Sequence, residues 1–484
     1  MRIAPIQAPG TASAGRGARR RGVTSILAMI FMVLFSTLAL GFYATVTTSV
    51  AMSRNERQSV ESRIATESGV EFMQYRLMQA KIDEAAPADY MDRVYTLLYE
   101  EMHGTANLLA PGSTVTIGAG DVVSVPETGY ITVDANTGGG FRATLTPLTS
   151  DLSKNQRLRA HIIGRSGTEG NRSYRAIDLE FRRRSSTLDY GIATKGAVVT
   201  SGSAQLLGVP DGTLADILST STATPAINIQ SSSVAGELYT VNPSPSAITV
   251  KSGTSVAGTT DSTTIQTQLT HEGELAPDFP TVNTSIFIPY ATNTLPLVVP
   301  ATIINTRIPA GRGTALTPLI LGNKTIEGVL YIEAPNVVTI NGNTTIRGII
   351  VGPNNPTGDV TTNKLTIAGN VQMIGLEALP GSYGDLRLLG GSLILMPKFL
   401  VTFSGTIGAA GGTVAAGQFT LTGASDLSLS GNILGLENQP LSLGGSGSLT
   451  IKPTTWVGTP SGLTFTNSTK GFVPVFSTFA EVPQ

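Results

Sequence analysis

A long uncharged segment near the N-terminus constrains this chain more than any other feature. No charged residue occurs from Val23 to Val46, and no acidic residue occurs before Glu56. A helix of that length can cross the hydrocarbon core of a bilayer, which needs ~20 residues. A cluster of arginines lies just before the segment: Arg16, Arg19, Arg20 and Arg21. Because Lys and Arg gather on the cytoplasmic side, we expect a single span with the C-terminal side exported.

The sequence leaves two simpler interpretations of this run open. One is an ordinary signal-anchor, and the other is a signal peptide cleaved after the run, whose apolar part would normally be only about 7–15 residues. The residues that follow favour a continuous helix instead. Between Val60 and Leu77, apolar residues recur near helical spacing with charged residues between them, and no proline occurs until Pro87. We therefore predict a membrane helix that continues as an amphipathic stem over residues 23–82.

This N-terminal region resembles type IV pilins. Arg20-Arg21-Gly22 before the apolar run is similar to the prepilin leader, which prepilin peptidase cuts after the glycine. The segment Arg57–Leu77 resembles the N-terminal region of PilX-like minor pilins and of the K-type minor pseudopilin of type II secretion. Its residues that carry the likeness are Arg57, Gln58, Glu67, Gly69 and Glu71. The resemblance covers about residues 16–100.

The resemblance implies a leader of residues 1–22, with cleavage between Gly22 and Val23. It also implies a bacterial cell-envelope location and a helix that contacts membrane lipid and other pilins or pseudopilins. The expected contact residues are Leu27, Ile30, Phe31, Leu34, Phe35 and Leu38. One position departs from the family, because most pilins have Glu at mature position five, where this chain has Leu27. A role at a filament tip therefore fits better than a role in the shaft.

The next region, residues 83–186, is expected to form a small antiparallel β module with one short helix. The helix is predicted at Tyr90–Met102. Short strands are predicted at 130–133, 141–145, 158–163 and 176–181, the last with alternating apolar and charged residues. Arginines are frequent here: Arg157, Arg159, Arg165, Arg172, Arg175 and Arg182 to Arg184. They form either a docking face for an anionic polymer or partner, or the solvated face of the sheet.

The remaining chain is rich in Gly, Ser, Thr and aliphatic residues. We divide it into a β-rich segment at 187–300, with a Ser/Thr-rich insertion, and a second β domain at 301–484. The phrase at Thr325–Leu330 recurs at Thr345–Ile350 and, less closely, at Thr366–Val371. A period near twenty residues with apolar-x-Gly phrases predicts a β-solenoid, and a β-sandwich is the alternative. The sequence leaves open whether the two regions form one stack.

Composition restricts the chemistry. The chain has no Cys and three His, which excludes thiolate sites and a His-rich metal centre, and its net charge of −1 does not favour nucleic acid. The best acidic cluster of the C-terminal region is Glu377 with Asp385 and Arg387. A polar segment at 271–278 contains His271, Glu274 and Asp278, but it matches no metal motif.

We therefore expect a mixed fold of long helix, small β module and mainly-β head. The expected function is that of a minor pilin-like structural component of a type IV pilus or type II secretion-like filament, without an enzyme activity or a cofactor. The expected partners are membrane lipid, other pilins and prepilin peptidase. The alternative is a membrane-anchored carbohydrate-binding or carbohydrate-degrading β-helix protein, for which a surface polysaccharide is the candidate ligand.

Overall fold

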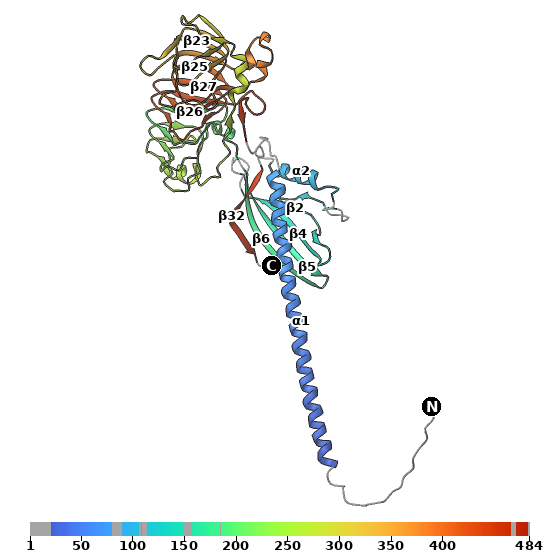
Figure 1. Ribbon diagram of the computed structural model, residues 1–484. Coiled ribbons are helices and arrows are strands. Elements are labelled where there is room, and N and C mark those ends of the chain that lie inside the picture. Colours follow the sequence, from blue (N-terminus) through green and yellow to red (C-terminus); the bar gives the residue numbers. More distant parts are fainter. Residues whose placement is uncertain are drawn as a thin grey trace, which may run out of the picture.

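The computed structural model describes residues 21–79, 90–105, 108, 114–148, 156–183, 185–465 and 471–482. It has three parts: a long helix, a small β module that packs on that helix, and a β-rich head (Figure 1). We call residues 90–183 and 471–482 the module, and residues 185–465 the head. Most of the predicted leader, residues 1–20, lies outside the described residues.

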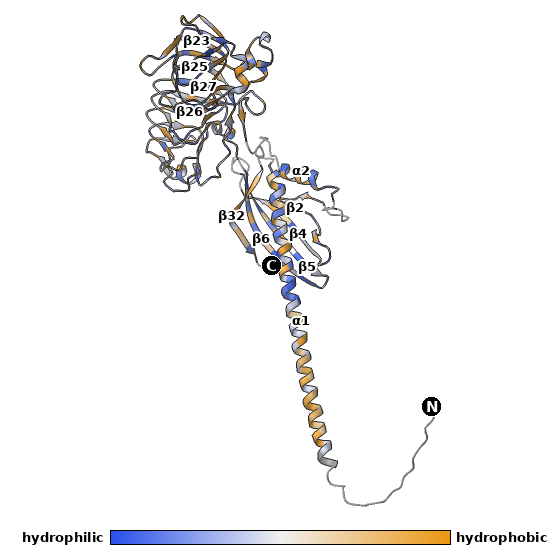
Figure 2. Ribbon diagram, viewed as in Figure 1, coloured by the Kyte–Doolittle hydropathy of each residue, from blue (hydrophilic) through white to orange (hydrophobic). Residues whose placement is uncertain are grey.

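Helix α1 (Arg21–Gln79) is one continuous helix of 59 residues, as the sequence predicted. It contains no proline, and ion pairs one helical turn apart, such as Arg57–Glu61 and Arg63–Glu67, support its second half. Its hydropathy changes along its length, from apolar near the N-terminus to mixed where it reaches the module (Figure 2). The first half projects away from the rest of the chain.

The module contains α2 (Tyr90–Met102), at the predicted bounds, and a seven-stranded antiparallel sheet. Its first strands are β1 (Thr116–Ile117), β2 (Val123–Val125), β3 (Ile131–Asp134), β4 (Gly139–Pro147), β5 (Arg157–Thr168) and β6 (Asn171–Arg183). In β6, Ile177, Leu179 and Phe181 are buried in the core shared with α1 and α2. The alternation seen in the sequence therefore places one face of the sheet on the helices.

The seventh strand, β32 (Phe472–Val482), comes from the C-terminus. It pairs antiparallel with β6, from Phe472 opposite Arg183 to Val482 opposite Ala176. From the sequence, these residues were expected to belong to the C-terminal β domain, but their hydrogen bonds close the edge of the module sheet instead. The head is thus inserted between two neighbouring strands of the module.

The head contains a 23-stranded sheet in which every strand pair is parallel. The strands before the chain crosses the head are β7 (Ile192–Thr194), β8 (Val198–Thr200), β9 (Gln205–Gly208), β10 (Ile217–Ser219), β11 (Ile227–Ile229), β12 (Ser233–Val234), β13 (Leu238–Thr240), β14 (Ile248–Val250), β15 (Ser255–Val256) and β16 (Thr270–Glu272). The later strands are β18 (Asn293–Thr294), β19 (Thr302–Ile308), β20 (Leu319–Gly322), β21 (Thr325–Ile332), β22 (Val337–Asn341), β23 (Asn343–Val351), β24 (Lys364–Ile374), β25 (Ser392–Gly411), β26 (Thr413–Leu421), β27 (Asp426–Ser430), β28 (Ile433–Gly435), β29 (Leu441–Leu443) and β30 (Ser448–Lys452).

Shorter elements lie between these strands. Strands β17 (Thr281–Val282) and β31 (Leu463–Thr464) form a separate antiparallel pair. The short helical segments are η3 (Thr187–Asp189), η4 (Gly212–Ala215), α3 (Ser262–Thr264), η5 (Ile265–Leu269), η6 (Thr284–Tyr290), η7 (Leu376–Ala378) and η8 (Gly381–Leu388).

The chain enters the head in the middle of its large sheet. Strands β7, β8 and β9 pair on one side with β10, β11 and β12, and on the other side with β28, β29 and β30. From β10 the chain proceeds to one end of the sheet at β16, then crosses to the other end at β18 and returns. The pairing of Ile192 with Ile433 therefore joins residues 187–300 and the following region in one sheet.

The head has apolar cores on both sides of its first row of strands. Ile192, Ile217 and Leu238 point into the core enclosed by the curled sheet. The alternate residues Ala193, Leu218 and Tyr239 are buried in a second core outside the sheet, together with Phe287 of η6. The segment between β16 and β18, which contains η6, thus covers the outer face of these strands. Because both faces of the strands are buried, their sequences are apolar without alternation.

The predicted repeat is partly in register. Thr325, Ile326 and Gly328 pair with Thr345, Ile346 and Gly348, so the offset of twenty residues is the pairing of β21 with β23. The third phrase does not follow, because Thr366 pairs with Thr339 and Thr402 instead. The insertion before β24 moves this phrase to a different row of the sheet.

Candidate assembly surface

The first half of α1 has an apolar surface that the rest of the described chain leaves uncovered. Every side chain from Thr24 to Met52 is exposed. The six predicted contact residues have exposed fractions between 51% and 64%: Leu27, Ile30, Phe31, Leu34, Phe35 and Leu38. By length and composition, α1 can cross a membrane. An apolar surface of this size requires lipid or other helices as a cover.

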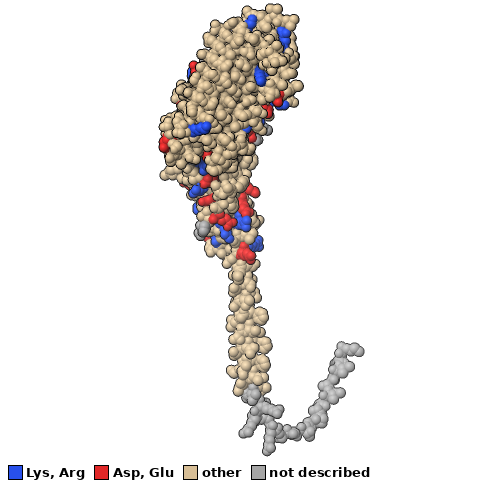
Figure 3. Space-filling model, turned by 90° about the vertical axis from the view of Figure 1, so that its left-hand side faces the viewer, with Lys and Arg blue, Asp and Glu red and all other residues tan. Residues whose placement is uncertain are grey.

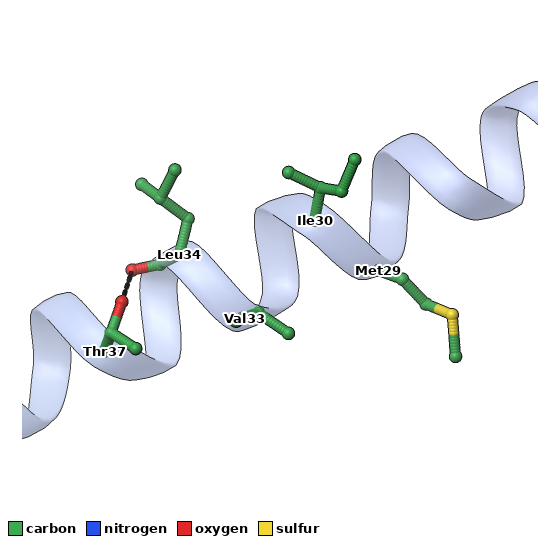
Figure 4. Close-up of a pocket in the computed structure, with 5 residues that line it drawn as sticks. All are labelled: Met29, Ile30, Val33, Leu34 and Thr37. Atoms are coloured by element: carbon green, nitrogen blue, oxygen red, sulfur yellow. Dashed lines mark hydrogen bonds between the residues drawn. The ribbon is translucent and has the colours of Figure 1, made fainter.

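A shallow groove on this helix is lined by Met29, Ile30, Val33, Leu34 and Thr37 (Figure 4). The Thr37 hydroxyl donates to the Leu34 carbonyl oxygen at 2.9 Å, so its donor is satisfied within the helix. Thr45, Thr47 and Thr48 donate to backbone carbonyls of the helix in the same way. These hydroxyls therefore need no partner outside the helix, which suits an apolar medium.

The second half of α1 packs closely on the module because a glycine lies at the contact on each side, Gly69 on the helix and Gly164 on the sheet. A Cβ atom on Gly69 would lie 2.8 Å from both Ile162 Cγ2 and Phe141 Cγ. On the sheet, a Cβ on Gly164 would collide with the backbone of α1 near Ser62 and Thr66. Gly69, predicted as a stem residue, thus lies at this contact, whereas Gly164, where the approach is closer, had no distinguishing signal in the sequence.

The polar stem residues have different surroundings. Gln58 is buried, and its Nε2 donates to the Asn171 carbonyl oxygen at 3.4 Å. Arg57 pairs with Glu61 at 2.8 Å, and Arg63 pairs with Glu67 at 2.9 Å. Glu71 is exposed.

Glu61 is a contact residue that the sequence analysis missed. Ser166 of β5 donates to the Glu61 carboxylate at 2.8 Å, and Arg57 donates to it from the preceding turn. These two hydrogen bonds hold the pKa of Glu61 below its ordinary value. Its position four residues after Arg57 was the available signal.

The predicted processing site lies at the start of α1. The helix begins at Arg21, so the bond between Gly22 and Val23 belongs to helical backbone. The side chains of residues 21–23 lie outside the described part of the chain, as do leader residues 1–20.

The arginines of the module are largely engaged within it. Arg159 pairs with Glu180 at 3.8 Å, Arg165 lies 4.1 Å from the centre of the Tyr130 ring, and Arg175 donates to Ser59 of α1. Arg184 lies outside the described residues. On the face shown in Figure 3, charged side chains of both signs gather on the module and are sparse over the head. The described arginines therefore occupy a face of mixed charge.

The candidate acidic residues of the head, Glu377 and Asp385, lie in η7 and η8. Arg387 Nη2 reaches the backbone carbonyl oxygen of Glu377 at 3.5 Å, and Asp385 is exposed. The Trp456 ring packs on Gly390, where Glu377 also approaches. These contacts hold the loop against the head. Among the interactions of the described residues, none brings a second carboxylate to Glu377.

His271 is part of an internal contact. Its Nε2 lies 2.8 Å from a Glu237 carboxylate oxygen, and its ring stacks on Tyr239 with centroids 4.5 Å apart. Burial raises the pKa of Glu274, and Arg182 of β6 opposes that effect. In the described part of the chain, no group of three or more His, Asp or Glu side chains could hold a metal ion.

No protein-family model and no curated protein matches the sequence. Among solved structures, the crystal structure of the competence-associated pilin ComZ from Thermus thermophilus is similar to this chain. The alignment has 13% identity, covers 88% of this chain and 97% of that chain, and gives a TM-score of 0.29. The likeness is to a pilin, the class that the N-terminal sequence resembles, but a TM-score of this size does not establish a shared fold.

Proposed function

We propose that this protein is a minor pilin-like structural component of a type IV pilus or a type II secretion-like filament. The observation that carries the proposal is the division of α1 into an uncovered apolar half and a half that packs on the module. Such a helix suits a protein that is first held in the bacterial inner membrane and then transferred into a bundle of similar helices. The proposed chemistry is association, without catalysis.

The proposed partners follow from the same helix. In the membrane, Leu27, Ile30, Phe31, Leu34, Phe35 and Leu38 contact lipid. In a filament, the same side chains contact the helices of other pilins or pseudopilins. Leu27 supplies no carboxylate for the terminal amine of a neighbouring subunit, so we place the protein at the filament tip or at the cell surface rather than in the shaft.

We further propose that the head is a β-solenoid displayed by this stem. The wholly parallel pairing and the offset of twenty residues between β21 and β23 support this assignment. Rows of like residues add to it, since Asn343 donates to Asn323 at 2.9 Å and Asn370 donates to Asn343 at 3.4 Å. At Gly348 a side chain would collide with the Gly328 backbone in the next row.

The test is the N-terminal sequence of the mature protein, measured by mass spectrometry from a host that contains prepilin peptidase. We expect a chain that begins at Val23. Gly22→Leu should retain the full leader, because the peptidase requires the small residue. Gly41→Leu is the matched control, since nothing lies within 4 Å of a Cβ at Gly41. A mature chain starting at Val23 in the Gly22 variant, or near residue 50 in the wild type, would contradict the proposal.

A further inference from the structure

The end of the head furthest from α1 is formed by the yellow segment at the top of Figure 1. The sheet ends there at β18, β19 and β20. Leu297 and Val298 are each 86% exposed, and Leu316 in the loop before β20 is 95% exposed. We call these three residues the crest. Outside the membrane half of α1, few large apolar side chains of the described chain are exposed to this degree.

The backbone beneath the crest is held in place from both sides. Leu295 is buried at 4% exposure, and its amide donates to the Arg307 carbonyl oxygen at 2.9 Å. Arg312 donates to the Pro296 carbonyl oxygen at 2.7 Å, and Lys324 donates to the Val299 carbonyl oxygen at 3.1 Å. The segment from Leu295 to Val299 therefore closes the end of the core, and its two central side chains are kept in solvent.

Two cations, Arg312 and Lys324, contact the backbone of the crest segment. Between Asn293 and Ile326 the sequence contains Arg307, Arg312 and Lys324 and no acidic residue. The nearest acids along the chain are Glu327, which accepts from the Tyr383 hydroxyl at 3.1 Å, and Glu333, which lies 3.6 Å from Arg307 and accepts from the Ala310 amide at 3.1 Å. Arg307 is thus paired, and Arg312 and Lys324 are the cations that remain beside the crest. Exposed aliphatic side chains above bound cations match a surface that is apolar inside and negatively charged outside.

We propose that the crest inserts into an anionic lipid bilayer, distinct from the membrane that holds α1. The crest side chains enter the acyl region, while Arg312 and Lys324 lie near the headgroups. A second copy of this chain is a poorer occupant, because two crests would bring like charges together. The inference rests on the proposed outward display of the head, since only a displayed head can meet another membrane.

The test uses the full chain, with α1 reconstituted in nanodiscs of pure phosphatidylcholine. The probe is a set of vesicles of phosphatidylglycerol and phosphatidylcholine in equal parts, and the readout is the fraction of nanodiscs that floats with the vesicles. The expected result is flotation that weakens as salt is raised. Replacing both Leu297 and Val298 by Ser should lower the partition coefficient by about tenfold or more, because each buried aliphatic side chain contributes substantially to partitioning.

The matched control is Val457→Ser, which removes an aliphatic side chain that is 93% exposed on another loop and should leave flotation unchanged. Circular dichroism melting of the double variant should match the wild type, since neither replaced side chain is buried. Three results would overturn the proposal: no flotation of the wild type, equal flotation with pure phosphatidylcholine vesicles, or no change in the double variant. Association of nanodiscs with one another, lost in the double variant, would assign the crest to a second copy instead. Each result is independent of leader cleavage, so it leaves the proposed pilin-like role to its own test.

Discussion

From Thr24 to Met52 every side chain of α1 is exposed, whereas from Gln58 to Leu77 one side of the helix is buried against the module. The buried positions of the second half include Ser62, Thr66, Gly69, Met73 and Leu77, which recur every three or four residues. The same backbone conformation thus serves two surroundings. The difference shows that packing against a module requires apolar or small residues on one face of a helix only. A membrane or a helix bundle can cover apolar residues on all faces.

The largest expected contrast is between two leucines of α1. Leu77→Ala should lower the free energy of unfolding of the module by about 2–5 kcal/mol, because Leu77 is fully buried. Leu38→Ala should leave it within about 0.5 kcal/mol, because Leu38 is 53% exposed. The measurement is hydrogen exchange of the β5 amides in detergent at increasing urea. Equal effects of the two changes would break the distinction between the halves.

An introduced charge should impair membrane insertion when it lies in the first half of α1 and have no effect on insertion when it lies in the second half. Leu34→Arg should make membrane insertion less favourable by about 2.5–3.5 kcal/mol, since an arginine near the centre of a span is costly. Val60→Arg, at a stem position that is 53% exposed, should have no such effect. Resistance to alkaline carbonate extraction is the readout. If both variants remain equally resistant, the span lies elsewhere on the helix.

The two glycines of α1 offer a smaller contrast with opposite signs. Gly69→Ala should destabilise the module by about 1–3 kcal/mol, because the new methyl group meets Phe141 and Ile162. Gly41→Ala should stabilise the helix by up to about 1 kcal/mol, because alanine is the better helix former and nothing lies nearby. Thermal unfolding in detergent measures both. A shift of the same sign for both would contradict the assigned contact.

The smallest expected effect is a pH dependence of the second half alone. The folded pKa of Glu61 is lowered by the hydrogen bonds from Ser166 and Arg57, so it lies below the unfolded value. The resulting stability is present above the unfolded pKa and is lost as the pH falls through the folded pKa. Ser166→Ala should reduce this loss on acidification. Unfolding of the β5 region as a function of pH is the measurement, and identical acid profiles for the two chains would exclude the contact.

The local elements were largely predictable from the sequence. Periodicity and the lack of proline predicted α1, and the bounds of α2 were correct at Tyr90 and Met102. Alternation predicted β6, and the repeat at Thr325 and Thr345 identified paired strands. These features depend on residues that are close in sequence, or on repeated phrases, and such patterns are visible without a structure.

The long-range arrangement was not predictable. Strand β32 pairs with β6 almost three hundred residues earlier, and the sequence carries no signal that links Phe472 to Arg183. The entry of the chain in the middle of the head sheet, at Ile192, was hidden for the same reason. At the candidate assembly surface, the apolar residues named from the sequence are exposed, and their contacts stay a prediction. Gly164 and Ser166 were missed because their role depends on the position of α1 over the sheet.

The insertion of the head between β6 and β32 has a mechanical consequence. Both strands run from the head alongside α1 (Figure 1), and they are hydrogen-bonded neighbours. A pulling force on the head would therefore enter the module through two adjacent strands along their length. The ladder between β6 and β5, from Arg182 opposite Arg157 to Asn171 opposite Thr168, would then bear the tension in shear, with its hydrogen bonds loaded together rather than one after another.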